Sequence, residues 1–259
     1  MKAFLRGLPG FKPIINLRSS LVQFEQSRPI FLAAQYVFSE CIEGDYIEFG
    51  VFKGSSFIQA LTAFEKASHT YSREWKKKNR SAYGIKQEQQ ADIDLKTHKR
   101  RDPEMRFFAF DSFEGLPSLA GEGEHPVWNQ GRFKLPKEEF LENVYKHHFN
   151  KKDSIRVVKG YFSETLKSEL YKKEKLEKVS VVMIDSDLYS SCKSALKFIE
   201  PLLQNGSIII FDDWNAFKGS AEYGERKATK EWLEINKHIQ LEPFASSGAY
   251  QRSFIVQKN

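Results

Sequence analysis

Two short apolar runs in the C-terminal half of the chain each end in carboxylates. Val181–Ile184 is followed by Asp185, and Ile208–Phe211 is followed by the adjacent pair Asp212 and Asp213. Continuous apolar runs bounded by polar residues are typical of strands that are buried on both faces, as in a parallel sheet covered by helices. The pattern therefore predicts two buried strands with acidic ends.

The segment between these two strands predicts a helix. Apolar residues recur at helical spacing from Tyr189 to Leu203, and Asn205-Gly206 then supplies a left-handed stop. A strand, a helix and a second strand within about 35 residues form a β-α-β unit, whose right-handed crossover makes the strands parallel. Both acidic ends then lie at the carboxyl edge of the sheet, where open α/β sheets bind their ligands.

We expect Asp185, Asp212 and Asp213 to converge at that edge. Three carboxylates side by side repel one another unless a cation lies among them, and hard oxygen ligands suit Mg²⁺, Mn²⁺ or Ca²⁺. An aspartate at a strand end can equally cap the next helix, which is the role we expect for Asp187. Asp185 alone leaves both roles open, whereas the doubled Asp212-Asp213 pair favours a metal site.

The N-terminal part of the chain predicts helices. Apolar residues from Leu17 to Ile42 follow a helical pattern, and Pro29 within it indicates two helices, the second starting near the proline. We expect residues 1–43 to form an N-terminal helical lid or leader that packs across the sheet, with plain core packing as the alternative. Residues 44–259 then form a single α/β domain.

A glycine-bearing turn follows the first predicted strand, Tyr46–Phe49. Glu48 and the glycines of the segment Gly50–Gly54 give the pattern E-x-G-x-x-x-G, and a helix is predicted from Ser55 to Lys66. The acid would repel a phosphate, so the turn favours a ligand that carries a cationic or hydroxyl group. Two glycines in a turn of this kind can also serve packing alone.

A second strand, Arg106–Asp111, also ends in an acid and follows a polar insertion at about 67–105. An acid at the end of the second strand of an α/β sheet is where a ribose diol is usually bound. A long loop at 116–135 comes next and contains His125. Loops of this length at the ligand edge of a sheet are more often functional than not.

The remaining pattern completes an α/β fold with seven strands. We expect His147 and His148, at the end of a helix over Lys137–Phe149, to be surface residues. The other predicted elements are a strand from Ile155, a charged helix over Thr165–Lys175, an amphipathic helix over Glu222–Lys237, and an antiparallel edge pair formed by Ile239–Phe244 and Tyr250–Val256.

Composition describes a globular chain of 259 residues that is 41% hydrophobic and 29% charged. No apolar run reaches the length of a membrane span, and glycine and proline interrupt the first ten residues before a signal-peptide core can form. Cys41 and Cys192 lie in apolar helical patterns, which predicts buried reduced thiols and a cytoplasmic location.

The net charge of +6 raises the question of nucleic-acid binding. Much of the excess lies in local Lys and Arg runs, which are usually solvated helix faces or loops. No RNP motif, zinc finger or aromatic–basic repeat accompanies these runs, so nucleic acid remains a minority hypothesis.

Five motifs in register resemble those of the macrocin O-methyltransferase family. They are Tyr46–Gly54, Phe110–Pro117 (with the specific stretch DSFEGLP), Lys159–Leu166, Ile184–Tyr189 and Ile210–Asp213. The resemblance covers residues 28 to 235. It implies a Rossmann-like class I methyltransferase fold with a mostly parallel seven-stranded sheet flanked by helices, and the use of S-adenosyl-L-methionine and a divalent metal such as Mg²⁺.

The resemblance also implies roles for individual residues. Glu48 and the Gly50–Gly54 turn would hold the methionine moiety, Asp111 the ribose, and Tyr161–Ser163 would lie near the adenine. The full set of cofactor-binding residues implied is Glu48, Gly50, Val51, Lys53, Gly54, Ser55, Asp111, Ser112, Phe162, Ser163 and Asp185; the metal ligands implied are Asp185, Asp212 and Asp213. Ser186 stands where the family commonly has glycine, and the insertion at 67–105 and the residues before about Gln26 do not match well.

The expected reaction is therefore O-methylation of a hydroxyl of a sugar, glycoside or similar polyol. The metal would acidify the hydroxyl and position it in line with the methyl–sulfur bond. Asp185 is the first candidate for the general base and His125 the second. The expected partner is a small sugar-containing acceptor, and the N-terminal helices could form a homo-oligomer interface.

Two other readings remain open. Asp185-Ser186-Asp187 also matches the D-x-D motif of metal-dependent glycosyltransferases, although those enzymes do not need the Glu48–Gly54 turn or the Asp212-Asp213 pair. An RNA-directed methyltransferase is supported only by the charge, and salt-dependent RNA binding would support it further.

Overall fold

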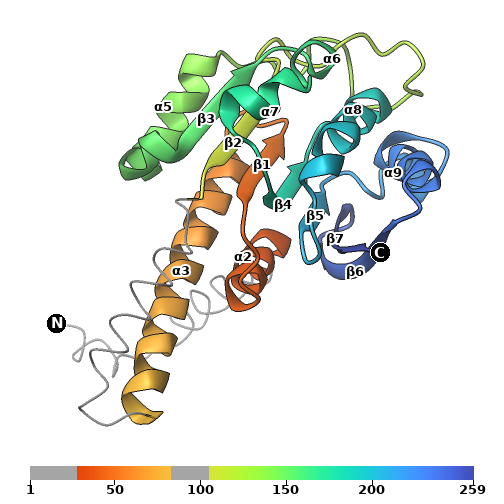
Figure 1. Ribbon diagram of the computed structural model, residues 1–259. Helices are drawn as coiled ribbons and strands as arrows, with labels where there is room; N and C mark the ends of the chain where they lie inside the picture. Colours follow the sequence, from red (N-terminus) through yellow and green to blue (C-terminus); the bar gives the residue numbers. More distant parts are fainter. Residues whose placement is uncertain (1–27, 83–104) are drawn as a thin grey trace, which may run out of the picture.

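The computed structural model describes residues 28–82 and 105–259, and within them a seven-stranded sheet forms the centre of the molecule (Figure 1). Its order is β3-β2-β1-β4-β5-β7-β6. The first five strands are parallel, and β7 pairs antiparallel with both β5 and β6. The strands are β1 Asp45–Phe49, β2 Phe107–Asp111, β3 Ile155–Lys159, β4 Val179–Ile184, β5 Ile208–Phe211, β6 Ile239–Ser247 and β7 Gln251–Lys258. This confirms the mostly parallel sheet and the antiparallel edge pair.

Helices cover both faces of the sheet (Figure 1). One face packs against α2 Pro29–Ser39, α3 Ser55–Ala82 and α5 Lys137–His148. The other packs against α6 Phe162–Thr165, α7 Glu169–Glu174, α8 Tyr189–Ile199 and α9 Gly224–Ile235. The short 3₁₀ segments are η3 Phe149–Ser154, η4 Glu200–Leu202 and η5 Phe217–Gly219.

The central strand β4 shows why its sequence reads as one apolar run. Val181 and Met183 point into the core beneath α2 and α3, whereas Val182 and Ile184 point into the core beneath α8 and α9. Successive side chains of a strand face opposite sides. A strand between two helical layers therefore carries apolar residues on both faces, and all six residues of β4 are buried, including its one polar residue, Ser180.

Helix α3 is longer than the apolar pattern predicts. We expected it to end near Lys66, but it continues to Ala82 and so takes up the first part of the polar insertion. The apolar stripe fades along this stretch, yet no glycine or proline interrupts it. Lys, Glu and Arg have high helix propensity, so a polar segment without a breaker can extend a helix. The rest of the insertion, up to residue 104, lies outside the described residues.

Three single-residue expectations are wrong. Cys41 is exposed, because it follows the end of α2 in a left-handed turn with φ 55°. His148 is buried and its Nε2 lies 2.9 Å from Thr62 Oγ1. Its spacing of four and eight residues from the buried Val144 and Phe140 places it on the inner face of α5. Asp187 adopts φ 60° and leaves the N-cap position of α8 to Leu188. Cys192 is buried, as expected.

Only one of the two predicted N-terminal helices lies within the described residues. The second predicted helix is α2, which starts at Pro29 and packs against α3, whereas the first lies outside the described residues. The lid role and the oligomer interface therefore stay predictions. Within residues 28–82 and 105–259, no helix is both long enough and apolar enough to cross a membrane.

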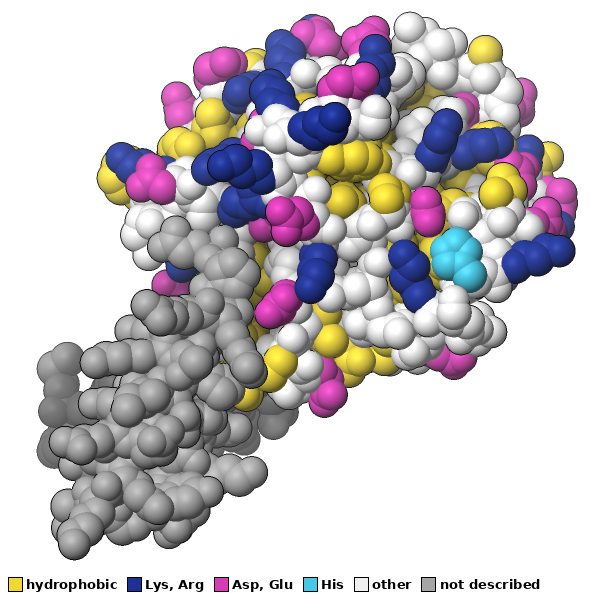
Figure 2. Space-filling view, viewed as in Figure 1, with side chains coloured by type: hydrophobic (Ala, Val, Ile, Leu, Met, Phe, Trp, Pro, Cys, Tyr) yellow, Lys and Arg dark blue, Asp and Glu magenta, His cyan; other side chains and the backbone are white. Residues whose placement is uncertain are grey.

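The visible surface carries charges of both signs. Figure 2 shows Lys and Arg side chains interspersed with Asp and Glu across this face, rather than gathered into one basic area. Lys178–Glu43 and Lys193–Glu231 are two of the surface ion pairs among the described residues. On this face, the mixed charge gives no support to a nucleic-acid surface.

Candidate active site

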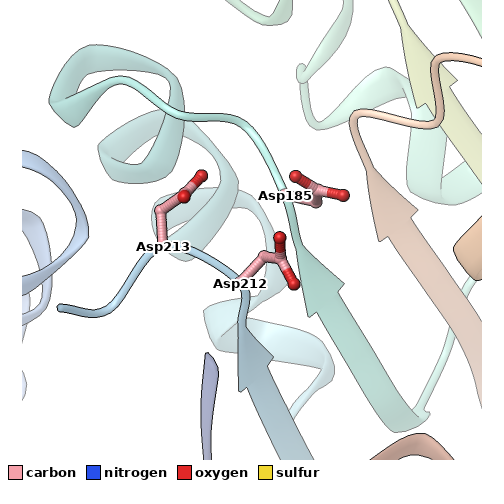
Figure 3. A group of neighbouring side chains, drawn as sticks. All are labelled: Asp185, Asp212 and Asp213. Carbon is pink, nitrogen blue, oxygen red and sulfur yellow. The ribbon is translucent and has the colours of Figure 1, made fainter. Parts of the chain in front are cut away.

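Three aspartates meet at the carboxyl edge of the sheet. Asp185 follows β4, and Asp212 and Asp213 follow the neighbouring strand β5. One carboxylate oxygen from each lies within 4.8 Å of the others, and the side chains point toward a common space (Figure 3). The register of β4 and β5, in which Ile184 pairs with Phe211, brings the two strand ends level and so produces this cluster.

The cluster concentrates negative charge in a half-buried place. Burial, and then the neighbouring Asp212 and Asp213, raise the pKa of Asp185 well above its ordinary value. Burial, and then the nearby Asp187 and Asp212, together raise the pKa of Asp213 to about 8. Asp187 and Asp213 share a hydrogen bond between their side chains. Without a cation, the carboxylates thus hold protons that they would lose in water.

Two further side chains form hydrogen bonds with residues of the cluster. Gln251 Nε2 donates a hydrogen bond of 2.6 Å to Asp212 Oδ1. The backbone N–H of Asp213 donates one of 3.0 Å to Glu225 Oε2, at the start of α9. Glu225 is 1% exposed, and its Oε1 has no hydrogen-bond partner among residues 28–82 and 105–259. A fourth carboxylate is therefore buried beside the first three.

This donor set fits a hard divalent cation. Three carboxylate oxygens within 4.8 Å of one another can share one ion, and carboxylate oxygen is the ligand preferred by Mg²⁺, Mn²⁺ and Ca²⁺. A cation would also offset the mutual repulsion that raises the pKa values of Asp185 and Asp213.

A cavity of about 550 Å³ lies against the cluster. All of Asp185, Asp212 and Asp213 line it, so the acidic edge opens directly into this space. It is also lined by the turn after β1, the start of the loop after β2, the segment after β3 and the first two turns of α8. The residues are Gly50, Phe52, Asp111, Ser112, Tyr161, Phe162, Ser163, Ser190, Ser191 and Ser194.

Asp111 joins the ends of β1 and β2 at this cavity. Its Oδ2 accepts hydrogen bonds from the backbone N–H groups of Val51 at 2.8 Å and Phe52 at 3.2 Å, and its Oδ1 accepts one from Phe113 at 2.7 Å. Gly50 is required at the turn because its φ is 85° and a Cβ would lie 1.8 Å from the carbonyl oxygen of Asp185. The glycine thus lets β1 and β4 end side by side.

A second cavity, of about 380 Å³, also borders the cluster. Asp185 and Asp212 line both cavities, so they stand where the two spaces meet. The second cavity is also lined by polar residues of α3 and of the segment before α2, at Arg28, Ser55, Ser56 and Gln59. Arg28 Nη1 donates a hydrogen bond of 2.6 Å to Gln59 Oε1.

Glu48 lies beneath the second cavity and is fully buried. Tyr46 and Ser56, which line that cavity, each donate a hydroxyl hydrogen bond of 2.5 Å to the Glu48 carboxylate. Burial raises the pKa of Glu48 to about 7, against these two hydrogen bonds, which lower it. A positively charged ligand group in this cavity would favour the ionised form of Glu48.

The structure brings most of the predicted site residues together. Gly50, Asp111, Ser112, Phe162, Ser163 and Asp185 line the first cavity, and Ser55 lines the second. Val51 contributes its backbone N–H to Asp111.

Three other predicted residues lie elsewhere. Lys53 is exposed, Gly54 packs beside Phe140 of α5, and the His125 ring stacks on Trp128 at 3.9 Å. None of the three is among the residues that line the two cavities. Burial lowers the pKa of His125.

Three residues that support the site were not predicted from the sequence. Tyr46 could have been found, because it lies two residues before Glu48 on the same face of β1. Glu225 carried no signal, since an acid in the first turn of an amphipathic helix usually complements the helix dipole at the surface. The sequence around Gln251 gave no indication of its role either, because Gln251 comes close to Asp212 only through the pairing of β7 with β5.

Comparison with known proteins agrees with this architecture. A calicheamicin methyltransferase, CalS11, has a similar fold, with a TM-score of 0.61 and 22% identity over 98% of this chain and 89% of that chain. At this identity the likeness establishes the fold, which is the Rossmann-like fold of class I O-methyltransferases.

Two Streptomyces enzymes are similar in sequence. The 8-demethyl-8-(2,3-dimethoxy-alpha-L-rhamnosyl)-tetracenomycin-C 4′-O-methyltransferase of Streptomyces olivaceus is 24% identical over 185 residues, which are 69% of this chain and 56% of that protein. The demethyldecarbamoylnovobiocin O-methyltransferase of Streptomyces niveus is 24% identical over 125 residues, 46% of this chain and 45% of that protein. The chain thus spans about half the length of these relatives.

The chain also matches a protein family as a whole. Residues 91–240, more than half of the chain, match the macrocin-O-methyltransferase (TylF) family. The matched range contains the acidic ends of β2, β4 and β5, and with them Asp111 and all three clustered aspartates. The chain therefore belongs to the macrocin-O-methyltransferase family.

Proposed function

We propose that this protein is an S-adenosylmethionine- and divalent-metal-dependent O-methyltransferase that acts on a hydroxyl of a sugar, glycoside or similar polyol. The observation that carries the proposal is the convergence of Asp185, Asp212 and Asp213 to within 4.8 Å at a cavity that also contains Gly50 and Asp111. One sheet edge thus combines a cation site with a turn suited to a nucleoside.

The two cavities divide the polar groups in a way that suits the methyl donor. In the first, Asp111 and Ser112 would bind the ribose, and Phe162 and Ser163 would lie at the adenine. In the second, the N-terminus of α3 with Ser55 and Ser56 favours the donor's carboxylate, because the N-terminal end of a helix attracts negative charge. Glu48 and Asp185 favour its ammonium group. The sulfonium would then lie near Asp185, which lines both cavities.

A divalent cation held by Asp185, Asp212 and Asp213 would supply Lewis acidity toward the acceptor's hydroxyl groups. The chain's own contribution is to hold these carboxylates in place. Gln251 orients Asp212 by a hydrogen bond, and Glu225 fixes the backbone at Asp213. Residues behind a metal ligand that orient it are often needed for metal affinity.

The reaction is a single displacement. S-adenosylmethionine would supply the methyl group to the acceptor oxygen, and the electron pair of its carbon–sulfur bond would stay on the sulfur of S-adenosylhomocysteine. The hydroxyl proton passes to a base. Asp185 is our first choice, because its carboxylate lines the cavity beside Asp212 and Asp213, where the acceptor hydroxyl would lie. His125 is the second choice, since burial lowers its pKa and favours the neutral imidazole.

The acceptor class is drawn from the family and from one relative. That relative is a 4′-O-methyltransferase of a rhamnosyl tetracenomycin. We extend the class, a small molecule that carries a sugar, to this chain. The apolar residues Leu116, Pro117, Val127 and Trp128 line the first cavity and could contact the apolar face of a sugar ring or its aglycone.

Calorimetric titration with S-adenosylmethionine, with Mg²⁺ and again with EDTA, tests this proposal. We expect micromolar binding that survives EDTA, together with Mg²⁺-dependent methyl transfer to a sugar-bearing acceptor. No binding of S-adenosylmethionine, combined with metal-dependent binding of a nucleotide sugar, would instead support a glycosyltransferase.

A further inference from the structure

The loop between β2 and α5, residues 112–136, forms one wall of the first cavity through Leu116, Pro117, Ser118, Val127, Trp128 and Phe133. Its two ends are joined by a pair of backbone hydrogen bonds. Leu116 N–H donates to the carbonyl of Arg132, and Gly131 N–H donates to the carbonyl of Leu116, each at 2.9 Å. The loop thus has a closed neck, and its tip can move without disturbing β2 or α5.

A single acid fastens the tip of this loop to α8. Glu122 is 5% exposed, and both of its carboxylate oxygens accept hydrogen bonds from the backbone N–H of Ser190, at 3.2 and 3.3 Å. The N-cap residue of α8, Leu188, offers no side-chain cap. An acid 68 positions away in sequence therefore caps this helix, where a negative charge is favoured.

Apolar contacts accompany this cap. Trp128 of the loop packs with Leu188 and Ala216, and its ring lies 5.1 Å from that of Phe217. Leu188 belongs to the turn after β4 and Ala216 to the turn after β5. The loop therefore rests on the two turns that carry the clustered aspartates.

The backbone beside Glu122 can change direction on both sides. Gly121 and Gly123 flank it with φ 84° and 82°, conformations that glycine adopts without strain. A Cβ at Gly123 would lie 2.7 Å from the ring of Tyr223, so this position is also a close contact when the loop is docked. These glycines allow rotation, whereas the carboxylate between them is buried and bound.

We propose that Glu122 is a latch that holds the 112–136 loop closed over the cavity, and that its bond to Ser190 breaks when ligands enter and leave. The proposal rests on the proposed function in one respect: the ligands that exchange are the methyl donor and its product. Glu122 is a positioning residue, because it acts on the cavity wall through the N-terminus of α8 and lines neither cavity itself.

The test compares Glu122→Ala with Glu124→Ala, since Glu124 is an exposed acid in the same loop. Stopped-flow fluorescence would measure the dissociation rate of S-adenosylhomocysteine from the full chain. Losing a helix cap shifts an equilibrium by about twofold to thirtyfold, so we expect dissociation to be faster by a factor in this range in Glu122→Ala. Glu124→Ala should match the wild type. Glu122→Gln retains one acceptor oxygen and should fall between the two.

Hydrogen exchange, measured without ligand, provides a second arm. The latch requires faster exchange in Glu122→Ala both at the Ser190 amide and across loop residues 116–131. Faster exchange at Ser190 alone, with an unchanged loop and an unchanged dissociation rate, would reduce Glu122 to a structural cap and overturn the proposal. Failure of the wild type to bind S-adenosylhomocysteine would contradict the proposed function, while the loop exchange would still decide the latch.

Discussion

Gln251 holds Asp212 from the neighbouring strand: Nε2 donates a hydrogen bond of 2.6 Å to Oδ1. Gln251 begins β7, and Asp212 follows β5, so the antiparallel pairing of these strands creates the contact. Burial raises the pKa of Asp212, and the hydrogen bond from Gln251 opposes this rise. The amide thus both orients this carboxylate and favours its ionised form.

Replacing this amide should weaken cation binding. We expect Gln251→Leu to reduce Mn²⁺ or Mg²⁺ affinity by roughly 10- to 100-fold, the usual cost of losing a residue that orients a metal ligand. Calorimetric titration with the metal alone measures the effect. Gln257→Leu, at an exposed position of the same strand, is the matched control. Equal affinities in the two variants would remove Gln251 from the site.

The Asp212→Asn substitution should impair metal binding without impairing binding of the methyl donor. We expect it to abolish most methyl transfer while leaving the affinity for S-adenosylhomocysteine largely intact, because the residue offers a cation ligand and the nucleoside groups lie elsewhere in the cavity. Activity assays and calorimetry on the same preparation measure both. Asp153→Asn, at an exposed site, controls for charge. Simultaneous loss of activity and of product binding would undo the metal assignment.

Asp111→Ala should weaken cofactor binding and also lower stability. Three backbone N–H groups, of Val51, Phe52 and Phe113, lose a charged acceptor, and leaving such groups unpaired costs about 1–3 kcal/mol each when they are buried. We expect a Kd for S-adenosylhomocysteine raised by about tenfold or more, and a lower Tm. A variant with a lower Tm but an unchanged Kd would show that Asp111 only shapes the turn.

Stability without metal should fall as the pH rises. Glu48, with a pKa raised to about 7, and Asp213, with one raised to about 8, bind more protons in the folded protein than in the unfolded chain. Their contribution is therefore full below about pH 4, the unfolded pKa, and is lost as the pH rises through about 7 to 8. Thermal unfolding in EDTA at a series of pH values should show this decline.

The same experiment with Mg²⁺ should show the opposite trend in the metal's effect. A cation competes with protons for the carboxylates, so the gain in Tm on adding Mg²⁺ should grow from about pH 5 to pH 8. Asp213→Asn should flatten the decline seen in EDTA. A gain in Tm that does not depend on pH would contradict cation binding at these aspartates.

Much of the fold follows from the apolar pattern. The strand β4 is buried on both faces, and its apolar run Val181–Ile184 and the acid that follows it are visible in the sequence. This run and the one in β5 place Asp185, Asp212 and Asp213 at one edge, because parallel strands end together. Helix α3 was underestimated, since its final turns are polar and only the lack of a breaker reveals them.

The contacts that hold the site together could not be predicted from the apolar pattern. Asp187 looked like a helix cap, but the tight turn after β4 gives it φ 60° and places Leu188 at the cap, so its side chain reaches Asp213 instead. Glu122 and Ser190 are 68 residues apart, and no periodicity relates them. Contacts of this kind depend on how loops dock, which local patterns do not encode.

The place of β7 between β5 and β6 has a consequence for protein synthesis. On a ribosome, β5 is synthesised about 40 residues before β7, the strand that pairs with its second edge. Ile208–Phe211 can complete this pairing only after Arg252–Ile255 have been made. Until then a strand of four apolar residues has an open edge, which is a template for pairing with other nascent chains. Chains that stall before β7 should therefore depend most on chaperones, and they would also lack the amide that holds Asp212.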